Sequence, residues 1–491
     1  MALLALVLLP AAAGGLAFLI RPDAPRRAML VCVAIAHACM TAAVWRVSTQ
    51  PVLNGWIAMD AQGLVFLSIT SALFLAVSVY AIHFLRNEQH GMRHDLEEDL
   101  LFANAPEAVF TGCLLLFLAT MTLVTVSQHF GLLWVAIESS TLASAPLIYF
   151  HRHHRSLEAT WKYLMICSVG VALALLGIFF LALGAERSGL EGSMRVADLV
   201  AQASQLEPAW MKAAFIFLLV GYGTKAGLAP LHTWLPDAHS EAPSLVSALL
   251  SGALLNCAFL GILRMMQVFV GAGQQAFAQQ LLVVFGLFSI GLAAVFLLEQ
   301  ADYKRLLAYS SVEHMGILAL GLGLGGIGAF GAMLHTVNHS FTKALLFLAA
   351  GNILAAYRSK STRDVTGLAR TLPATSFLWV AGFFAIAGSP PFGTFMSEFT
   401  ILRAALNQGR YIVAIAYIAF LSLVFIGMSR SVLAMAQGPP PDRPINASAH
   451  ESWQAIAPPA ALAIVVLLLG FYVPPALNAL LHEAARSLGG M

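Results

Sequence analysis

Charged residues are scarce in this chain. Asp, Glu, Lys and Arg make up only 10% of its 491 residues, while 59% are hydrophobic and the mean hydropathy is +0.81. A soluble domain carries about 25% charged residues. So few charges cannot cover the surface of a soluble protein, and so many apolar residues exclude a disordered chain. The net charge of +2 also excludes a strong field that would recruit nucleic acid. We expect an all-α polytopic membrane protein.

Cysteine is scarce as well. The five cysteines lie in apolar stretches without any C-x-x-C spacing: Cys32, Cys39, Cys113, Cys167 and Cys257. This pattern argues against a disulfide framework, a zinc site or an iron–sulfur cluster built on these cysteines. The sequence therefore predicts no metal and no cofactor.

Long polar segments are missing too. A membrane span needs about 20 mostly apolar residues, and the sequence predicts fourteen such spans. They are 2–20, 28–45, 62–85, 107–127, 130–150, 163–184, 210–230, 243–269, 279–298, 306–325, 328–356, 375–402, 411–429 and 455–480. No basic residue precedes the first, which favours a span over a signal peptide. The longest loops, 86–106, 185–209 and 430–454, are too short for a catalytic domain, so we expect any soluble active site to belong to another subunit.

The basic residues predict the orientation of the chain. Sixteen of the 26 lysines and arginines fall in odd-numbered loops, against five in even-numbered loops and Arg486 in the tail. By the positive-inside rule, the odd-numbered loops are cytoplasmic. Both termini are then periplasmic in a bacterial inner membrane.

Two of the spans are interrupted by proline and glycine. Span 7 runs into TKAGLAPLHTWLPDAHSEAP, and span 12 contains GSPPFGTF. Paired interruptions five spans apart suggest two repeated halves with an ion path at the breaks. We expect two inverted five-helix units, 107–270 and 279–429, preceded by a three-helix segment, 1–106, and followed by a helix in 455–491.

Four ionisable residues fall inside predicted spans and are the main candidates for a proton path: Glu138, Lys225, Lys343 and Glu398. A charge at the bilayer centre costs about 2.5–3.5 kcal/mol, so each needs a partner, water or a function. Buried Glu and Lys both titrate nearer neutral pH than usual, which suits proton transfer. A static buried salt bridge is the alternative.

His335, His339 and Lys343 recur every four residues on span 11, so they share one helix face over about 12 Å. This spacing suits a proton relay, but helix packing or ligation of a haem or metal by the histidines stays open. On span 10, Glu313 and His314 line the same axis or Glu313 bonds to nearby serine hydroxyls.

Other polar groups have ordinary alternatives. His232, with Asp237, His239 and Glu241, surrounds the turn between spans 7 and 8 and is either an end of the proton path or a water-facing loop.

Lys212 and Arg264 are expected to snorkel at span ends. The run HRHHR at 151–155 is expected to be a solvated basic cluster.

Several of these motifs together are specific. TKAGLAPLHTWLPDAHSEAPSLVSALLSG and ADYKRLLAYSSVEHMG resemble the antiporter-like subunits of complex I, membrane-bound [NiFe]-hydrogenases and Mrp antiporters. HTVNHSFTKALLFLAAGNI and STRDVTGL resemble the hydrogenase-4 component F type.

This resemblance implies a fourteen-helix proton channel, with Glu138 and Lys225 as the pair whose separation drives the proton step. It also matches Glu398 to the residue at the span 12 break and His339 to a span 11 histidine. The sequence departs from the pattern at Asn256, where several relatives carry a lysine.

These features predict a proton-translocating subunit of a redox-driven complex, with other antiporter-like membrane subunits as partners and no cofactor of its own. The alternatives are a sodium/proton antiporter, autonomous or Mrp-like, and a haem protein with His335 and His339 as ligands.

Overall fold

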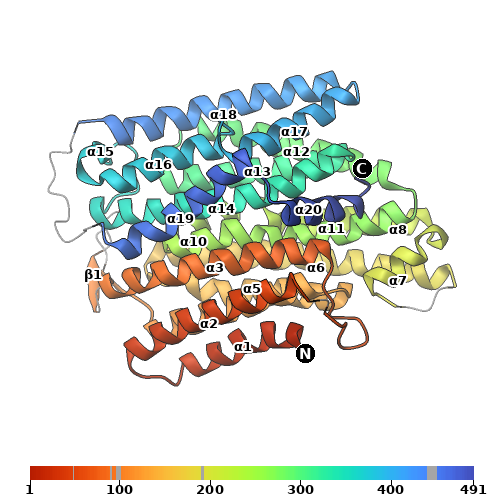
Figure 1. Cartoon of the computed structure of the whole chain (residues 1–491), viewed down its shortest axis with the longest axis horizontal. Helices are drawn as coiled ribbons and strands as arrows, with labels where there is room; N and C mark the ends of the chain where they lie inside the picture. The colour runs from red at the N-terminus through yellow and green to blue at the C-terminus, as the bar shows by residue number, and fades with distance from the viewer. Residues whose placement is uncertain (48, 89–90, 95–100, 190–192, 440–450, 491) are drawn as a thin grey trace.

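The computed structural model describes residues 1–47, 49–88, 91–94, 101–189, 193–439 and 451–490, which are almost entirely helical (Figure 1). The first half contains α1 (Ala2–Ala17), α2 (Asp23–Val44), α3 (Ala61–Asn87), α4 (Glu107–Val126), α5 (Phe130–Ile148), α6 (His154–Arg187), α7 (Val196–Ala201), the 3₁₀ turn η1 (Ala203–Gln205), α8 (Pro208–Ala226), α9 (Trp234–Glu241), α10 (Ser244–Leu249), the π-helix η2 (Leu250–Leu254) and α11 (Leu255–Gly271). The second half contains α12 (Gln275–Leu297), α13 (Tyr303–Leu324), α14 (Ile327–Tyr357), α15 (Leu368–Thr371), α16 (Pro373–Ile386), α17 (Gly393–Asn407), α18 (Tyr411–Gln437), α19 (Trp453–Phe471) and α20 (Pro475–Arg486). Strands β1 (Met92–His94) and β2 (Leu101–Ala103) pair antiparallel.

Within the described residues, eleven helices are long and apolar enough to cross a membrane. The other three predicted spans coincide with α1, with α8, and with α16 and α17 together. Both α1 and α16 are shorter apolar helices. The chain is therefore an integral, multi-pass membrane protein.

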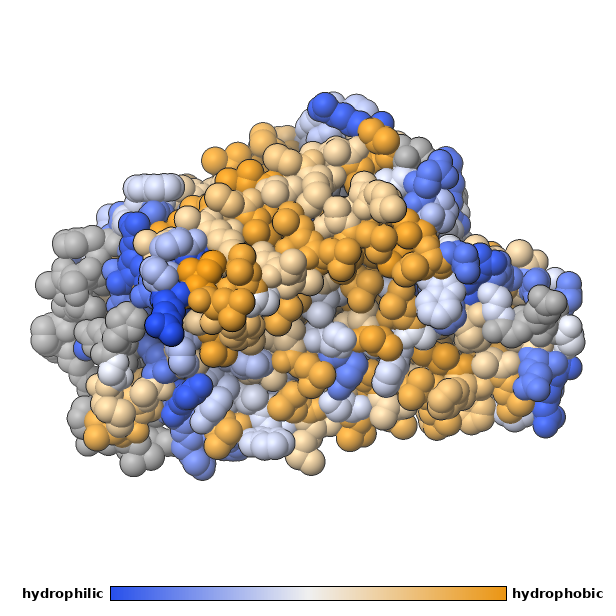
Figure 2. Space-filling model, turned by 90° about the horizontal axis from the view of Figure 1, so that it is seen from below, coloured by the Kyte–Doolittle hydropathy of each residue, from blue (hydrophilic) through white to orange (hydrophobic). Residues whose placement is uncertain are grey.

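The helices divide into a central and a peripheral set. The continuous segment α10–η2–α11 is surrounded by other helices over its whole apolar length, and α13 is almost as deeply enclosed. The peripheral helices instead expose large apolar side chains, such as Trp161 and Met165 of α6 and Ile415 of α18. Figure 2 shows hydrophobic residues across the middle of one face and mostly hydrophilic residues at its two ends. This distribution is typical of a membrane-embedded protein, with apolar side chains on the surface that faces the lipid.

The loops with odd numbers meet at one end of the bundle. Glu241 of loop 7 contacts Lys360 of loop 11 at 2.7 Å and His153 of loop 5 at 3.7 Å. Backbone bridges join Asp302 of loop 9 to Ser361 and Asn104 of loop 3 to His151. Loops 3, 5, 7, 9 and 11 thus lie at one end of the bundle, as predicted, while parts of 86–106 and 430–454 lie outside the described residues.

Both predicted helix interruptions are present. α8 ends at Ala226 with Gly227 in the left-handed conformation, and α16 ends at Ile386 shortly before Gly388, which is also left-handed. At the first break the indole of Trp234 donates to the carbonyl of Thr224 at 2.9 Å. At the second, the amide of Asn338 donates to the carbonyl of Gly393 at 2.8 Å. Side chains therefore satisfy backbone groups that the breaks free, as irregular backbone at membrane depth requires.

Arg264 does not snorkel, so that prediction is wrong. Its side chain on α11 is fully buried and makes two hydrogen bonds to the carboxylate of Asp60, which caps the start of α3. The guanidinium reaches a partner inside the protein instead of the membrane surface, because α3 packs against α11. Lys212 lies in the first turn of α8 beside the ring of Phe277, 5.5 Å from its centroid.

Candidate functional site

The structure links Lys225 and Glu138 through a hydroxyl group. The ammonium of Lys225, at the last turn of α8, donates to Thr141 Oγ1 and, at 3.1 Å, to the hydroxyl of Tyr163. Thr141 Oγ1 in turn lies 3.2 Å from Glu138 Oε2 on the same helix, α5. Glu138 Oε1 accepts a hydrogen bond of 2.7 Å from Ser168 of α6.

This arrangement differs from a closed ion pair. Lys225 is fully buried, whereas Glu138 is only half-buried. The pair is brought together as the sequence predicted, but Thr141 stands between the two charges. Thr141, Tyr163 and Ser168 were not predicted from the sequence, since a hydroxyl residue in an apolar helix gives no signal of its own partner.

In the second half, three histidines pack together between α13 and α14. His314 Nδ1 lies 2.9 Å from His335 Nε2, and the two rings are stacked with centroids 5.0 Å apart. The ring of His339 is also 5.0 Å from that of His314. All three side chains are fully buried. The geometry therefore favours the interpretation that His314 lies on the same axis as the span 11 histidines.

Ser397 of α17 fixes the outer histidine of this cluster. Its hydroxyl lies 2.9 Å from His335 Nδ1 and also 2.8 Å from the carbonyl oxygen of Thr394. A serine that gives its proton to the Thr394 carbonyl accepts from His335 Nδ1–H. The tautomer of His335 then has its lone pair on Nε2, directed at His314.

Glu398 brings a carboxylate to the histidines from beyond the second break. One ligand atom each of His314, His335 and Glu398 lie within 4.8 Å of one another. The carboxylate packs against Gly388, where an added Cβ would lie 1.9 Å from Glu398 Oε2. Glycine is therefore required at 388 both for its positive φ and for this close approach.

Glu313 sits beside the cluster without joining it fully. Its Oε2 accepts from Ser310 at 3.3 Å and lies 3.8 Å from His314 Nε2. Both interpretations of Glu313 from the sequence thus describe part of its surroundings, because one carboxylate oxygen faces both the serine hydroxyl and the imidazole.

Lys343 is fully buried one turn of α14 beyond His339. Its ammonium donates to the backbone carbonyl of Leu307 on α13 at 2.7 Å. Among the described residues it has no ion pair within 4 Å. A lysine held by one carbonyl can give up or take a proton with little rearrangement of its neighbours.

Asn256 lies between the two halves. Its amide donates to Gly252 in the π-helix at 2.8 Å and to Ser340 of α14 at 2.7 Å. Ser251 of the same π-helix is 2.8 Å from Ser311 of α13. These bonds direct the polar groups toward α13 and α14, so the central helix carries hydroxyl and amide groups at this position.

The histidines of the turn between α8 and α10 are not water-facing. His232 is only 5% exposed and packs edge-on to Tyr309, and His239 is fully buried and stacked on Phe347 with ring centroids 5.0 Å apart. Lys304, predicted as a loop residue, is also buried, and its ammonium donates to the carbonyls of Ser240 and Ala242. It thereby caps the C-terminal end of α9.

Around this cap lies a cluster of charges at the odd-loop end, outside the spans. Burial alone would raise the pKa of Glu241, but the charge and hydrogen bond of Lys360, with the charges of Arg155 and Lys304, lower it to about 2. Asp237 pairs with Lys162 at 3.0 Å and with Arg305. His153 of the run 151–155 contacts Glu241, so this run is tied to the turn instead of being merely solvated.

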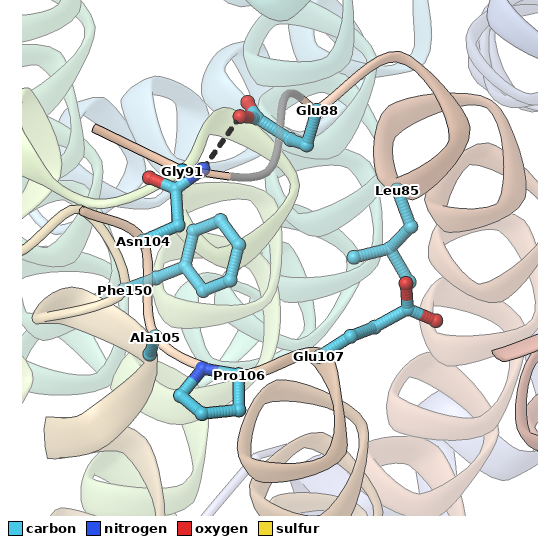
Figure 3. A pocket seen from close by; sticks show the side chains of 8 residues that line it. All are labelled: Leu85, Glu88, Gly91, Asn104, Ala105, Pro106, Glu107 and Phe150. Atoms are coloured by element: carbon cyan, nitrogen blue, oxygen red, sulfur yellow. Dashed lines mark hydrogen bonds between the residues drawn. The ribbon is translucent and has the colours of Figure 1, made fainter. Parts of the chain in front are cut away.

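A separate small cavity of about 130 Å³ opens at the same end of the bundle. Its lining includes Glu88, Asn104, Glu107 and Phe150, and Asn104 donates to Glu88 at 2.9 Å (Figure 3). Glu107 is engaged by Arg27 at 2.6 Å. None of the residues predicted for the proton path lines this cavity.

Comparison with known proteins matches most of this architecture. The family model described as NADH:quinone oxidoreductase/Mrp antiporter, transmembrane, matches residues 127–425. The chain is 38% identical over 361 residues to the hydrogenase-4 component F homolog of Methylacidiphilum infernorum, covering 72% of this chain and 74% of that protein.

Solved structures share the fold across the full length of the chain. A chain of an archaeal membrane-bound sulfane sulfur reductase superposes with a TM-score of 0.86 at 20% identity, covering 99% of this chain and 98% of that one. A chain of respiratory complex I from Thermus thermophilus gives a TM-score of 0.81 at 22% identity, with complete coverage of both. Residues 127–425, which the family model matches, contain both broken helices and the residues predicted for the proton path. The chain belongs to the NADH:quinone oxidoreductase/Mrp antiporter transmembrane family.

Proposed function

We propose that this chain moves protons across the membrane as one subunit of a redox-driven complex of the hydrogenase or NADH:quinone oxidoreductase type. One observation carries the proposal: the titratable side chains of α5, α8, α13, α14 and α17 gather inside the bundle, although the surrounding helices are apolar. A charge inside a membrane protein is costly unless it has a partner or a pathway.

The first five-helix unit, 107–270, loads a proton. Lys225 carries it, and the hydroxyl of Thr141 couples Lys225 to Glu138. Movement of Glu138 toward or away from Thr141 changes how strongly the ammonium form of Lys225 is stabilised. A redox step in a neighbouring subunit acts on this half-buried carboxylate, and His232 marks the end of the path near the turn.

The second unit, 279–429, passes the proton on. Asn256 and Ser251 of the π-helix hold water between the units, and Lys343 receives the proton. Transfer then proceeds through His339, His314 and His335 to Glu398, with Glu313 as a neighbouring carboxylate. Imidazole suits this role because one ring nitrogen accepts a proton while the other donates one.

The proposal assigns the rest of the machinery to partners. Other membrane subunits, including other antiporter-like chains, flank this one. The redox centres lie in other subunits of the complex. The odd-loop end faces the bacterial cytoplasm, and the termini face the periplasm. Cysteines placed at positions 154 and 361 are expected to resist an impermeant thiol reagent added to the periplasmic side, and labelling from that side contradicts this orientation.

The direct test is proton pumping in vesicles that contain the intact complex running on its own substrate. Lys225→Ala is expected to abolish acidification measured by dye quenching at equal protein level. Lys212→Ala, which removes a lysine from the other end of α8, is the matched control and is expected to pump normally. More than about half of the wild-type rate in Lys225→Ala contradicts the proposal.

The same vesicles separate proton pumping from sodium/proton exchange. With labelled sodium inside and no redox substrate, the proposal expects no sodium release driven by an inward proton gradient. Sodium release that disappears in Lys225→Ala would instead assign the chain to the antiporter class.

A further inference from the structure

His314, His335 and Glu398 form a compact group on three different helices, α13, α14 and α17. Their side-chain ligand atoms lie within 4.8 Å of one another, and all three side chains are buried. In the part of the chain that the structure describes, they are the group of His, Cys, Asp and Glu side chains whose geometry fits one metal ion. The rings of His335 and His339, which share a helix face, lie with centroids 6.3 Å apart, and it is His314 that hydrogen-bonds to His335.

One detail shows that the group has unused capacity to bind. Glu398 is only 6% exposed, and its Oε1 atom is buried without a hydrogen-bond partner among the described residues. A buried polar atom without a hydrogen-bond partner is energetically unfavourable, so a ligand that engages it is favoured.

The surroundings of His335 match those of a metal ligand. Ser397 holds Nδ1 at 2.9 Å, which leaves the lone pair of Nε2 pointing at the group. Metal-bound histidines almost always have the second ring nitrogen fixed in this way. The 2.9 Å between His335 Nε2 and His314 Nδ1 needs to widen only to about 3.3 Å to place both at tetrahedral angles on a zinc ion with bonds of about 2.0–2.1 Å.

We propose that His314, His335 and Glu398 bind a divalent metal of the zinc class, and that the bound metal stops proton transfer through the second half. Two imidazole nitrogens and one carboxylate oxygen suit Zn²⁺ or Co²⁺, whereas Na⁺ and Mg²⁺ prefer oxygen ligands alone. A water molecule completes four-coordination. The metal uses the lone pairs that the relay uses for protons, so occupancy and proton transfer exclude each other.

Metal binding at this group does not depend on the proposed function, whereas inhibition of proton transfer by the metal rests on it. Binding is tested with Co²⁺ alone, because tetrahedral Co²⁺ absorbs visible light more strongly than octahedral Co²⁺. The protein is purified in detergent with the subunits that accompany it, and Co²⁺ is titrated into wild type and variants. The difference spectrum between wild type and variant removes the absorption of partner subunits.

Wild type is expected to show one tetrahedral Co²⁺ per chain that His335→Gln and Glu398→Gln lose. His239→Gln, which removes a histidine that is equally buried but lies outside the group, is expected to keep the full signal. Ser397→Ala removes only the support of His335 and is expected to weaken Co²⁺ affinity about tenfold or more. This graded loss tests the site even if a ligand variant folds poorly. The site is overturned if wild type shows no tetrahedral signal, or if His335→Gln, Glu398→Gln and Ser397→Ala all give the wild-type spectrum and affinity.

Inhibition is then measured as the decrease in the pumping rate of vesicles as the Zn²⁺ concentration is raised. Wild-type pumping is expected to fall as the site fills, and Ser397→Ala is expected to need about tenfold more Zn²⁺. If Co²⁺ binds as described but Zn²⁺ leaves pumping unchanged, the inhibition is wrong while the site stands. If Lys225→Ala pumps normally and Co²⁺ still binds, the proposed function fails and the metal site remains.

Discussion

The two halves of the molecule organise their buried ionisable groups in different ways. In the first half, Lys225 is held by the hydroxyls of Thr141 and Tyr163, and Glu138 is reached through Thr141. In the second half, imidazoles face one another and a carboxylate, with Ser397 as the hydroxyl that orients them. The first half therefore holds an ammonium group against neutral hydroxyl acceptors. The second half offers several imidazoles that can each carry a proton briefly.

This difference follows from the position of each break relative to its charged residue. Lys225 precedes the first break, so its long side chain leaves the last turn of α8 and reaches α5. Glu398 follows the second break on α17 and lies against Gly388 at the end of α16, close to the histidines. The same kind of interruption thus presents a cation to hydroxyl groups in one half and a carboxylate to imidazoles in the other.

A large effect is expected from removing the link that distinguishes the first half. Thr141→Val keeps the side-chain shape but removes the hydroxyl between Lys225 and Glu138. We expect proton pumping to fall at least tenfold, because Lys225 loses a hydrogen bond and its coupling to the carboxylate. Thr141→Ser, which keeps the hydroxyl, is the control and is expected to retain most of the rate, as measured by dye quenching. Normal pumping in Thr141→Val would show that the two charges communicate without this residue.

The next prediction concerns the start of the second half. Lys343→Met is expected to block transfer to Glu398, since no other amine lies on that face of α14. Adding Asn256→Lys to this variant is expected to restore part of the flux, because Asn256 hydrogen-bonds to Ser340 on the adjoining turn of α14. Pumping in the intact complex measures both variants. If Lys343→Met pumps normally, Lys343 is a structural cation bound to the Leu307 carbonyl and not a relay.

A smaller but clear effect is expected at the second break. Gly388→Ala places a Cβ on the Glu398 carboxylate and on a backbone with φ of +61°. The carboxylate must move away from the histidines, so we expect pumping to fall severalfold with a lower thermal stability. Gly15→Ala, at a helical glycine with open space around its Cβ position, is the control and is expected to change neither property. Equal pumping by both variants would mean that the position of Glu398 does not limit the rate.

The smallest effect lies outside both halves, at the charge cluster that holds the turn. The pKa of Glu241 is about 2, below its ordinary value of 4.5, because Lys360, Arg155 and Lys304 surround it. A carboxyl group whose pKa is lower in the folded than in the unfolded protein stabilises the folded state fully at pH values above the unfolded pKa. This stabilisation, on the order of 3 kcal/mol, is lost as the pH falls from the unfolded pKa to the folded pKa. Glu241→Gln is expected to melt below wild type at pH 7 in detergent, with the difference narrowing between about pH 4.5 and pH 2. A difference that is independent of pH would contradict this role.

Much of this architecture is present in the sequence. Runs of apolar residues determine membrane spans, because the bilayer accepts only long apolar helices. Proline and glycine at 227–236 and 388–391 determine where two of them break, since proline removes a helical hydrogen bond and glycine accepts positive φ. The spacing of His335, His339 and Lys343 likewise places them on one face of α14, which the structure confirms as a buried face.

What the sequence could not determine is which side chains meet across helices. The spacing predicts that His335 and His339 share one face of α14, but only the packing of α13 against α14 brings His314 within 2.9 Å of His335. The sequence placed Arg264 at a membrane surface, but Asp60 neutralises it inside the bundle. Local patterns report the face on which a residue lies, whereas the partner depends on the rotation and depth of a second helix. Only the tertiary structure sets those, because they depend on the packing of all the helices at once.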